Sequence, residues 1–499
     1  MHLRPHPIPF VESSMSTDSL RPLSVRAEQF HHLLDTGEAS LDGLRVAAGL
    51  RDPAAVAALA TLNATARANR VEPWLMHLQG LPVDHLDLPD AEAGWLDALA
   101  GLPLRSLKLD SPRFACGRAV WRRLPALRLE SLEIDGFGRA DDGSGLPSLE
   151  RLRRLSLRTR SEDFGDTFIE HLAGGVLEDL ALNGCEEVTD DGLRALSRLS
   201  MRSLSLERPD GISARGLALL RGHPLEHLGL VSTRAVSEDP SCLGGLRSLR
   251  SLRLDQCHAD DAVLEALRGL RIERLSLRGG WVTEDGLAGL AGLPLAELDL
   301  HGAAQLDGLG STLQALRGLP LKRLVLGDLR GFDEAGLVHL KGLPLESLDL
   351  SLNRVTADGL RHLAGLPLKD LRIGFCDGID GEALRVLAGL KLPLERLDLG
   401  GLVLRDADLA HVRQLPLRHL SLSESPWLTD AGVAMLAGLS LQHLTIGAGP
   451  GESKLTSASV EPLAELPLET LWLPNASGID AAGWTRLAAL PARVTGPGI

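Results

Sequence analysis

The octapeptide LPLAELDL at residues 293–300 returns along the chain in close copies at nearly constant intervals. Three of these copies are LPLKRLVL at 319–326, LPLESLDL at 343–350 and LPLKDLRI at 366–373. Each copy has the apolar spacing L-x-x-L-x-L, and alternating apolar residues are typical of a strand with one buried face. The first apolar position of the pattern occurs 17 times, at intervals of 21 to 27 residues. A short unit repeated along most of 499 residues predicts a repetitive array rather than several unrelated domains.

A second pattern recurs between these strand segments. Its copies are VTDDGLRAL at 188–196, VTEDGLAGL at 282–290, VTADGLRHL at 355–363 and LTDAGVAML at 428–436. The Thr in second place is suited to accept hydrogen bonds from the first backbone N–H groups of a helix. Acidic residues follow in the first turn, where the helix dipole favours them. Each unit is therefore predicted to run from strand to turn to helix and back.

These two patterns together resemble the leucine-rich repeat family, over roughly residues 81–499. The most similar variety is the cysteine-containing repeat often found beside F-box domains, although residues 24–80 carry no F-box pattern. The resemblance implies an α/β fold, a solenoid curved like a horseshoe. Its parallel sheet would line the concave face, and its helices would cover the convex face. The resemblance also implies binding of a protein by the concave sheet and the adjacent loops.

The cysteine-containing repeats carry Asn or Cys at the third residue after the last leucine of the strand, where the side chain bonds neighbouring loop backbones. In this chain Cys185, Cys257, Asn353 and Cys376 occupy that position. The resemblance therefore implies a structural role for these four residues. A redox or metal role is the alternative for the three cysteines.

The repeats also set the expected domain limits. We expect a disordered leader at residues 1–20 and a helical N-terminal cap at 21–80. The solenoid of about 17 repeats would occupy 81–474, and a C-terminal cap 475–499. Within that cap a helix is expected at 479–490 and an edge strand at 492–496. Either Met1 or Met15 could be the true start.

Composition argues against several classes of protein. The net charge of -14 disfavours a nucleic-acid-binding surface, which is usually basic. No stretch approaches the ~18 apolar residues of a membrane span, and the first residues lack the apolar run of a secretory signal. The five cysteines have no paired spacing that would indicate a disulfide framework. We therefore expect a cytoplasmic monomer, and the excess of Arg over Lys indicates a GC-rich, bacterial source.

One column of the predicted sheet carries alternating charges. Equivalent residues on neighbouring parallel strands would lie about 4.8 Å apart, so columns can be listed from the sequence. The residue after the first apolar position reads Asp84, Arg105, Glu130, Arg153, Glu178, Arg202, Glu226, Arg250, Glu273, Ala296, Lys322, Glu346, Lys369, Glu395, Arg418, Gln442, Glu469. None of its neighbouring pairs is like-charged, and opposite charges on adjacent strands stabilise a sheet. This column also accounts for the basic segment at 151–160, because Arg153 falls between Glu130 and Glu178 while Arg154 falls beside Asp179.

Two further columns of the predicted concave face offer candidate contacts with a protein. The candidate protein-binding residues are Arg253, Asp299, Asp349, Arg372, Asp398, His419, His443 and Trp472. The group Asp349–Arg372–Asp398 is either a binding site or a second internal charge ladder. Trp472 is either part of the end cap or an exposed interface anchor. His419 and His443 could form a pH-sensitive contact or hold a metal, but no third ligand is evident, so no metal site is assigned.

No motif of catalysis or cofactor binding is present. The chain lacks the phosphate-binding loop, the dinucleotide fingerprint, H-E-x-x-H, C-x-x-C and the nucleophile elbow. We therefore expect a non-enzymatic scaffold or inhibitor without cofactors, whose partner is a protein and neither nucleic acid nor membrane. The alternative is a secreted effector or a recognition subunit, similar to a ubiquitin-ligase adaptor, that delivers a target protein to an enzyme.

Overall fold

The computed structural model describes residues 84–89, 95–110, 123–137, 150–159, 164–306, 312–329, 332, 334–448 and 453–496. The expected leader and the expected N-terminal helical cap lie outside these residues. The chain divides into two compact units, residues 1–184 (unit 1) and residues 185–499 (unit 2). Each unit is described by itself.

Unit 1 is a parallel sheet built from successive repeats. Its strands are β1 (His85–Pro89), β2 (Ser106–Asp110), β3 (Ser131–Phe137), β4 (Arg154–Thr159) and β5 (Asp179–Asn183). Each strand pairs with the next in the sequence. The described helical segments are α4 (Trp95–Leu99), the 3₁₀ helix η2 (Leu124–Leu127) and α6 (Asp166–Leu172).

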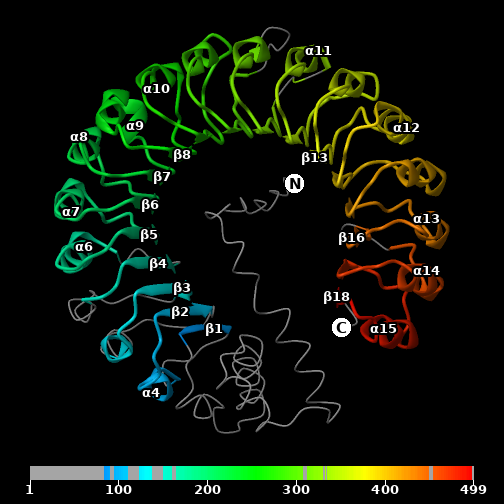
Figure 1. Ribbon diagram of the computed structural model, residues 1–499, viewed down its shortest axis with the longest axis horizontal. Coiled ribbons are helices and arrows are strands. Elements are labelled where there is room, and N and C mark those ends of the chain that lie inside the picture. Colours follow the sequence, from blue (N-terminus) through cyan, green and yellow to red (C-terminus); the bar gives the residue numbers. More distant parts are fainter. Residues whose placement is uncertain are drawn as a thin grey trace. The chain divides into compact units, whose positions relative to one another are not determined.

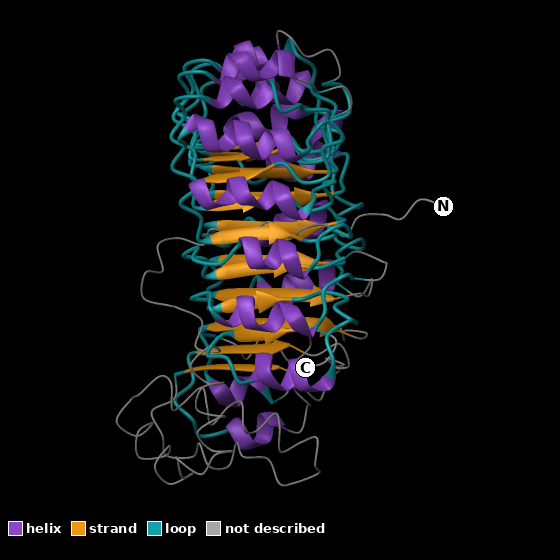
Figure 2. Cartoon of the chain, turned by 90° about the vertical axis from the view of Figure 1, so that its right-hand side faces the viewer, coloured by secondary structure: helices purple, strands orange, loops and turns teal. Residues whose placement is uncertain are grey.

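Unit 2 continues the same plan over a longer parallel sheet. Its strands are β6 (Ser203–Glu207), β7 (His227–Val231), β8 (Ser251–Asp255), β9 (Arg274–Ser276), β10 (Glu297–Asp299), β11 (Arg323–Val325), β12 (Ser347–Asp349), β13 (Asp370–Arg372), β14 (Arg396–Asp398), β15 (His419–Leu422), β16 (His443–Ile446), β17 (Thr470–Trp472) and β18 (Arg493–Thr495). Figure 1 shows these strands along the inner side of a curved array and the helices along its outer side. In Figure 2 the strands of successive repeats lie side by side across the array.

The helical side of unit 2 mixes two kinds of helix. The α-helices are α7 (Asp190–Leu196), α8 (Ala214–Ala218), α9 (Ala235–Glu238), α10 (Asp261–Ala266), α11 (Glu334–Leu337), α12 (Gly381–Leu390), α13 (Asp430–Met435), α14 (Val460–Ala464) and α15 (Ala481–Ala488). The 3₁₀ helices are η4 (Pro240–Gly245), η5 (Gly286–Leu290), η6 (Thr312–Leu316), η7 (Val338–Leu340), η8 (Gly359–Leu363), η9 (Asp406–Gln414) and η10 (Ser457–Ser459). Several units thus carry the tighter helix, which spans a given length with fewer residues than an α-helix. The expected C-terminal helix and edge strand correspond to α15 and β18.

The predicted register of the repeats is confirmed. Leu298 of β10 pairs with Leu324 of β11, which pairs with Leu348 of β12. The three leucines of one unit, Leu345, Leu348 and Leu350, are each 0% exposed. Burying a leucine side chain contributes roughly 1.5–3 kcal/mol, and a unit can bury these side chains only against its neighbours. The stacked leucines therefore hold the array together.

The Cys and Asn positions bond the loops that follow the strands. The Sγ of Cys257 donates to the carbonyl oxygen of Leu230 at 3.2 Å, and the Sγ of Cys376 donates to that of Leu350 at 3.2 Å. Cys185 makes the same kind of bond to Glu207, at 3.1 Å. Burial raises the pKa of the Cys185 thiol to about 12. These thiols are therefore hydrogen-bond donors within the fold and poor nucleophiles.

Asn353 makes three of these loop bonds by itself. Its Nδ2 donates to the carbonyl oxygens of Leu326 at 2.7 Å and Leu350 at 2.8 Å. Its Oδ1 accepts from the backbone N–H of Leu329 at 3.0 Å. The side chain is 4% exposed, so it satisfies backbone groups that water does not reach.

The acidic residue of the helix motif also bonds the next repeat, which was not expected from the sequence. Asp261 of α10 accepts from the backbone N–H of Thr283 at 2.7 Å and from its Oγ1 at 2.6 Å. Asp406 accepts in the same way from Thr429, at 2.9 and 2.7 Å. The motif therefore links consecutive repeats as well as capping a helix.

The glycine of the same motif makes room for this bond. A Cβ built on Gly286 would overlap the carboxylate of Asp261 in the preceding repeat. A Cβ on Gly432 would likewise overlap the Oδ1 of Asp406. The recurrence of glycine after the acidic pair thus reflects the close approach of two repeats.

Candidate binding surface

The candidate residues lie on the inner side of the unit 2 sheet in two columns. Six of them share the inner column, which the strand register orders as Arg253, Ser276, Asp299, Val325, Asp349, Arg372, Asp398, Ser421, Thr445 and Trp472. His419 and His443 are paired in the neighbouring column. The structure therefore brings the candidates onto one sheet but spreads them over many strands.

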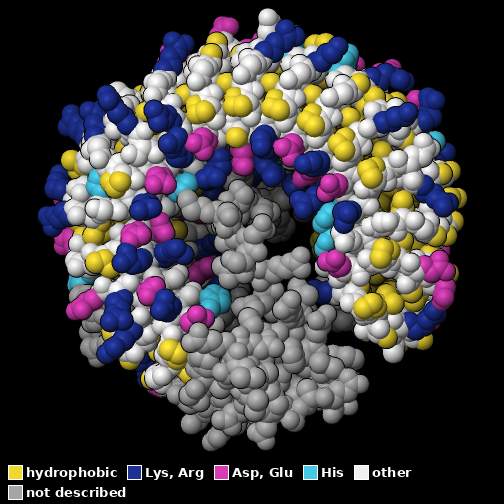
Figure 3. All heavy atoms as spheres, viewed as in Figure 1, with side chains coloured by type: hydrophobic (Ala, Val, Ile, Leu, Met, Phe, Trp, Pro, Cys, Tyr) yellow, Lys and Arg dark blue, Asp and Glu magenta, His cyan; other side chains and the backbone are white. Residues whose placement is uncertain are grey.

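The alternating charge column forms ion pairs along the edge where the strands begin. Lys369 donates to Glu346 at 2.9 Å, and Lys322 lies 3.8 Å from the same carboxylate. Arg250 pairs with Glu273 at 3.0 Å. Figure 3 shows Lys and Arg side chains interspersed with Asp and Glu along the inner margin of unit 2. Each such exposed ion pair contributes little to the free energy of unfolding. The main effect of the pairs is to favour this strand register over shifted registers.

Ion pairs between neighbouring strands also neutralise arginines of the basic segment at 151–160 in unit 1. Arg153 donates to Glu178, and Arg154 lies 3.2 Å from Asp179. The predicted neighbours Glu178 and Asp179 therefore form ion pairs, whereas Glu130 contacts Arg153 through its carbonyl oxygen, which accepts from the backbone N–H of Arg153 at 2.8 Å. These arginines already have acidic partners on the adjacent strand, which makes the segment a poor surface for phosphates.

Arg253 and Asp299 belong to a polar network at the ends of β8, β9 and β10. Arg253 donates to Asp255 at 2.5 Å, and Arg278 donates to Asp299 at 2.8 Å. The two aspartates are each 3% exposed. Burial raises the pKa of Asp299, although Arg278 opposes this effect. Since Asp299 is buried, it offers little surface to a partner, whereas Arg253 remains partly exposed.

The cluster of Asp349, Arg372 and Asp398 lies in direct register. Its carboxylates are directed to the backbone, since Asp349 accepts from the N–H of Ser351 at 2.9 Å and Asp398 from that of Gly400 at 3.1 Å. The ion pair of Arg372 is instead with Asp370, at 3.8 Å. The three residues are thus not linked to one another as a charge ladder. The side chain of Arg372 is 36% exposed and is held by one long ion pair.

His419 and His443 stack on adjacent strands. Their ring centroids are 4.1 Å apart with an interplanar angle of 12°, and the Nδ1 of His443 lies 2.7 Å from the Oγ1 of Thr470. Burial, the neighbouring His443 and two arginines lower the pKa of His419 to about 4. His419 is therefore neutral at physiological pH, which argues against a pH-sensitive contact near pH 7. Within the described ranges, no group of three or more His, Cys, Asp or Glu is placed to hold a metal.

Trp472 ends the inner column. It pairs with Thr445 of β16 and Thr495 of β18, and both neighbours have small side chains. Its indole is 51% exposed. Of the two alternatives, the structure favours an exposed aromatic residue over a buried part of the end cap.

Exposed apolar residues occur in the loops that follow strands β12 to β15, and the sequence reasoning did not place them in the binding surface. They are Leu352, 38% exposed, Phe375, 42% exposed, Val403, 65% exposed, and Trp427, 54% exposed. A Cβ on Gly401 would overlap the ring of Phe375, so this ring lies across the next loop. Leu352 and Phe375 have positive φ, 63° and 56°, a backbone conformation that the sequence pattern did not indicate.

The comparison with family models agrees with the repeat geometry. The model described as Leucine Rich repeat matches residues 176–197 and 344–364. The first match includes β5, Cys185 and α7, and the second includes the buried leucines Leu345, Leu348 and Leu350. The chain contains leucine-rich repeats and folds as a leucine-rich repeat solenoid. Leucine-rich repeat proteins generally mediate protein–protein interactions, whereas the special resemblance to the F-box-associated variety is not confirmed.

Individual relatives share this repeat over part of their length. A Trypanosoma equiperdum protein named "Putative adenylate cyclase regulatory protein" is 32% identical over 199 residues, which are 39% of this chain and 30% of that protein. The chain thus spans less than a third of that relative's length. Among the helices that the structure describes, none has the length and apolar character needed to cross a membrane.

Two solved structures align with most of the leucine-rich repeat chain. One is the complex of Rad7 and Elc1 in yeast, with 14% identity, 96% of this chain and 98% of that chain covered, and a TM-score of 0.40. The other is the TLR13–ssRNA13 complex, with 20% identity, 86% and 53% covered, and a TM-score of 0.42. The fold assignment rests on the matched repeats and the repeat geometry rather than on these alignments.

Proposed function

We propose that this protein is a non-catalytic scaffold or inhibitor that binds another protein through the concave sheet of unit 2 and the adjacent loops. The observation that carries the proposal is the inner column, where the exposed indole of Trp472 and the guanidinium of Arg372 lie on one continuous sheet. Aromatic and arginine side chains are the commonest anchors of protein interfaces. The sheet from β6 to β18 measures about 60 Å along its strands' stacking direction, at ~4.8 Å per strand. That length suits a folded partner or a long peptide segment better than a metabolite.

The loops beyond β12 to β15 extend this surface in the proposal. Leu352 and Phe375 are exposed on neighbouring repeats, and exposed apolar groups next to a polar face are typical of interaction sites. We place the protein in the cytoplasm, because Cys185, Cys242, Cys257 and Cys376 are free thiols.

The test is affinity capture from native lysate with the wild type and the variant Arg372→Glu/Trp472→Ala. We expect the specific partners of the wild type to be lost from the variant. The matched control is Arg385→Glu/Met435→Ala, which changes exposed residues of α12 and α13 on the helical side. The proposal is wrong if every captured protein survives the first variant, or if the control variant loses the same proteins.

A further inference from the structure

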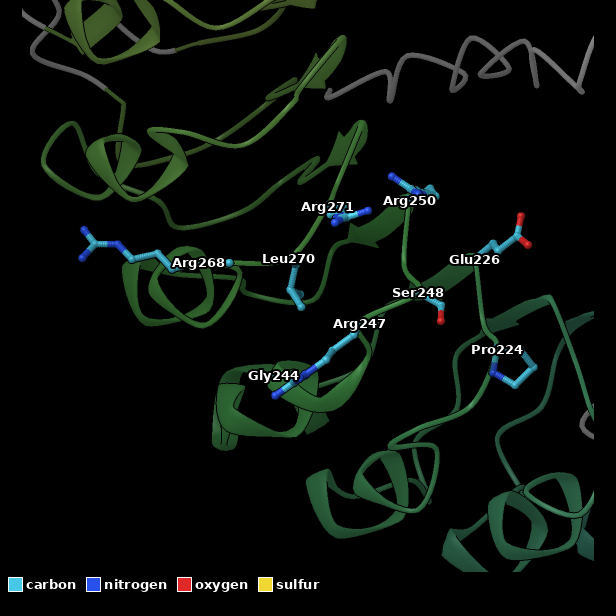
Figure 4. Close-up of a pocket in the computed structure, with 10 residues that line it drawn as sticks. Pro224, Glu226, Gly244, Arg247, Ser248, Arg250, Arg268, Leu270 and Arg271 are labelled. Atoms are coloured by element: carbon cyan, nitrogen blue, oxygen red, sulfur yellow. The ribbon is translucent and has the colours of Figure 1, made fainter.

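A hollow of about 840 Å³ lies where strands β7, β8 and β9 begin. We call it the arginine hollow, because its lining includes Arg247, Arg250, Arg268 and Arg271, with Glu226 as the one acidic residue among the described lining residues. Figure 4 shows Arg250 and Arg271 near the strands, Arg247 extending toward Gly244, and Arg268 extending away from the other lining residues. The volume falls within the ~300–1,000 Å³ typical of ligand sites. A basic hollow is unexpected in a chain of net charge -14.

The hollow coincides with a local departure from the repeat. Most later strands are entered through Leu-Pro-Leu, as at 293–295 and 343–345. The entry to β9 is instead Leu-Arg-Ile at 270–272, and the entry to β8 is the longer Leu-Arg-Ser-Leu at 246–249. Arginine thus replaces proline in two consecutive repeats.

A second hollow lies at another strand entry of unit 2. It measures about 520 Å³ and lies before β16, where Leu-Ser-Leu at 439–441 lacks the proline. Arg413 and Arg418 line it. The first hollow differs from the second in its larger number of arginines, four instead of two.

Two of the four arginines are available to a ligand. Arg250 pairs with Glu273 at 3.0 Å, and Arg268 pairs with Glu265 at 2.8 Å. Arg247 and Arg271 are exposed and have no acidic partner among the described residues. Uncompensated positive charge is therefore concentrated on two guanidinium groups from neighbouring repeats.

The geometry of these groups indicates their ligand. A guanidinium presents a planar fork of donors that matches a carboxylate with two parallel hydrogen bonds. Arg247 and Arg271 precede strands of neighbouring repeats, and such strands are ~4.8 Å apart. One short segment with two acidic residues can therefore reach both arginines. A long polyanion such as nucleic acid would be repelled by the net charge of -14.

We propose that the arginine hollow binds a short acidic peptide segment, with Arg247 and Arg271 each holding a carboxylate. The proposal rests on the proposed function in one respect, since it takes the partner to be a protein. It concerns a different surface from the inner column.

The test is fluorescence anisotropy with the full chain and a labelled peptide of alternating Glu and Gly at low salt. We expect Arg247→Ala/Arg271→Ala to weaken binding by at least about 10-fold, because each charged hydrogen bond is worth more than that factor when it is lost. The equivalent Gln–Gly peptide should not bind. Arg247→Lys/Arg271→Lys keeps the charge but removes the forks, and its affinity should lie between the two.

The control variant Arg413→Ala/Arg418→Ala changes the second hollow and should bind the peptide as the wild type does. The proposal is overturned if this control loses as much affinity as the test variant, since the effect would then be general electrostatics. It is also overturned if the test variant binds normally, or if pyrophosphate displaces the peptide at lower concentration than unlabelled peptide does. Arg372→Glu/Trp472→Ala should bind the peptide normally, so failure of the concave-face proposal is seen separately.

Discussion

Replacement of Gly286 by alanine tests the link between consecutive repeats. Gly286 begins η5, and a Cβ at this position would overlap the side chain of Asp261 in the repeat before. Asp261 cannot move away without lengthening its hydrogen bonds from the N–H and the Oγ1 of Thr283, which are 2.7 and 2.6 Å long. The substitution should therefore break both bonds to relieve the overlap.

The expected loss follows from those two bonds. A hydrogen bond to a charged group contributes about 1.5–3 kcal/mol, and half-exposed groups fall toward the lower limit. We expect Gly286→Ala to lower the free energy of unfolding by about 2–4 kcal/mol. The control is Gly389→Ala in α12, where a Cβ would meet no atom within 4 Å. Alanine should stabilise that exposed helical position by roughly 0.5–1 kcal/mol, so the two substitutions have opposite signs.

Urea unfolding followed by circular dichroism measures the difference, and hydrogen exchange of the amides of residues 283–290 locates it. The local measurement is needed because repeat arrays often unfold in more than one step. The double variant Asp261→Ala/Gly286→Ala decides the mechanism. Once the carboxylate is absent, the added methyl group has no overlap, so the two losses should be far from additive. Additive losses, or a Gly286→Ala variant as stable as the wild type, would refute the proposed close approach.

Two further predictions concern single side chains. Asn353→Ala should lower the free energy of unfolding by about 2–5 kcal/mol, because three hydrogen bonds end on this buried side chain. Asn353→Cys should recover part of that loss, since Cys376 bonds a loop carbonyl at the same position of the next repeat. Equal stability of the two variants in urea would contradict this prediction. The pKa of His419 is lowered from 6.5 to about 4 in the folded chain, so the unfolded chain binds the proton more strongly. The free energy of unfolding should therefore fall as the pH drops from about 6.5 to about 4, and it should level off below that. The His419→Gln variant should lack this component of the pH dependence, and an NMR titration of His419 near pH 6.5 would contradict the prediction.

The sequence was sufficient to predict the repeat, its register and its core. Those properties depend on periodicity, and a residue such as Leu348 is buried whichever rotamers surround it. The pairing of Arg153 with Glu178 was predictable for the same reason, since opposite charges in one column meet on neighbouring strands. The exposure of Trp472 was left open, because it depends on how small its neighbours on β16 and β18 are.

Other features needed the folded chain. Arg372 lies in register between Asp349 and Asp398, yet its ion pair is with Asp370 of its own strand. Residues from adjacent strands lie only ~4.8 Å apart, so several partners are within reach and the side-chain rotamers choose among them. The burial of Asp299 followed from packing at the ends of the strands rather than from its place in the column.

The amino-acid pattern alone specified that leucines repeat at the interval of one solenoid turn, which is enough to define strands, stacking and a parallel sheet. Packing between the turns determined the remaining features. These are the hydrogen bonds between Asp261 and Thr283, the close approach of Gly286 to Asp261, and the arginine hollow beside β8 and β9. The reason is physical: burial of leucine is non-directional and tolerates small shifts, whereas hydrogen bonds and ion pairs depend on distances that exist only after the repeats have stacked.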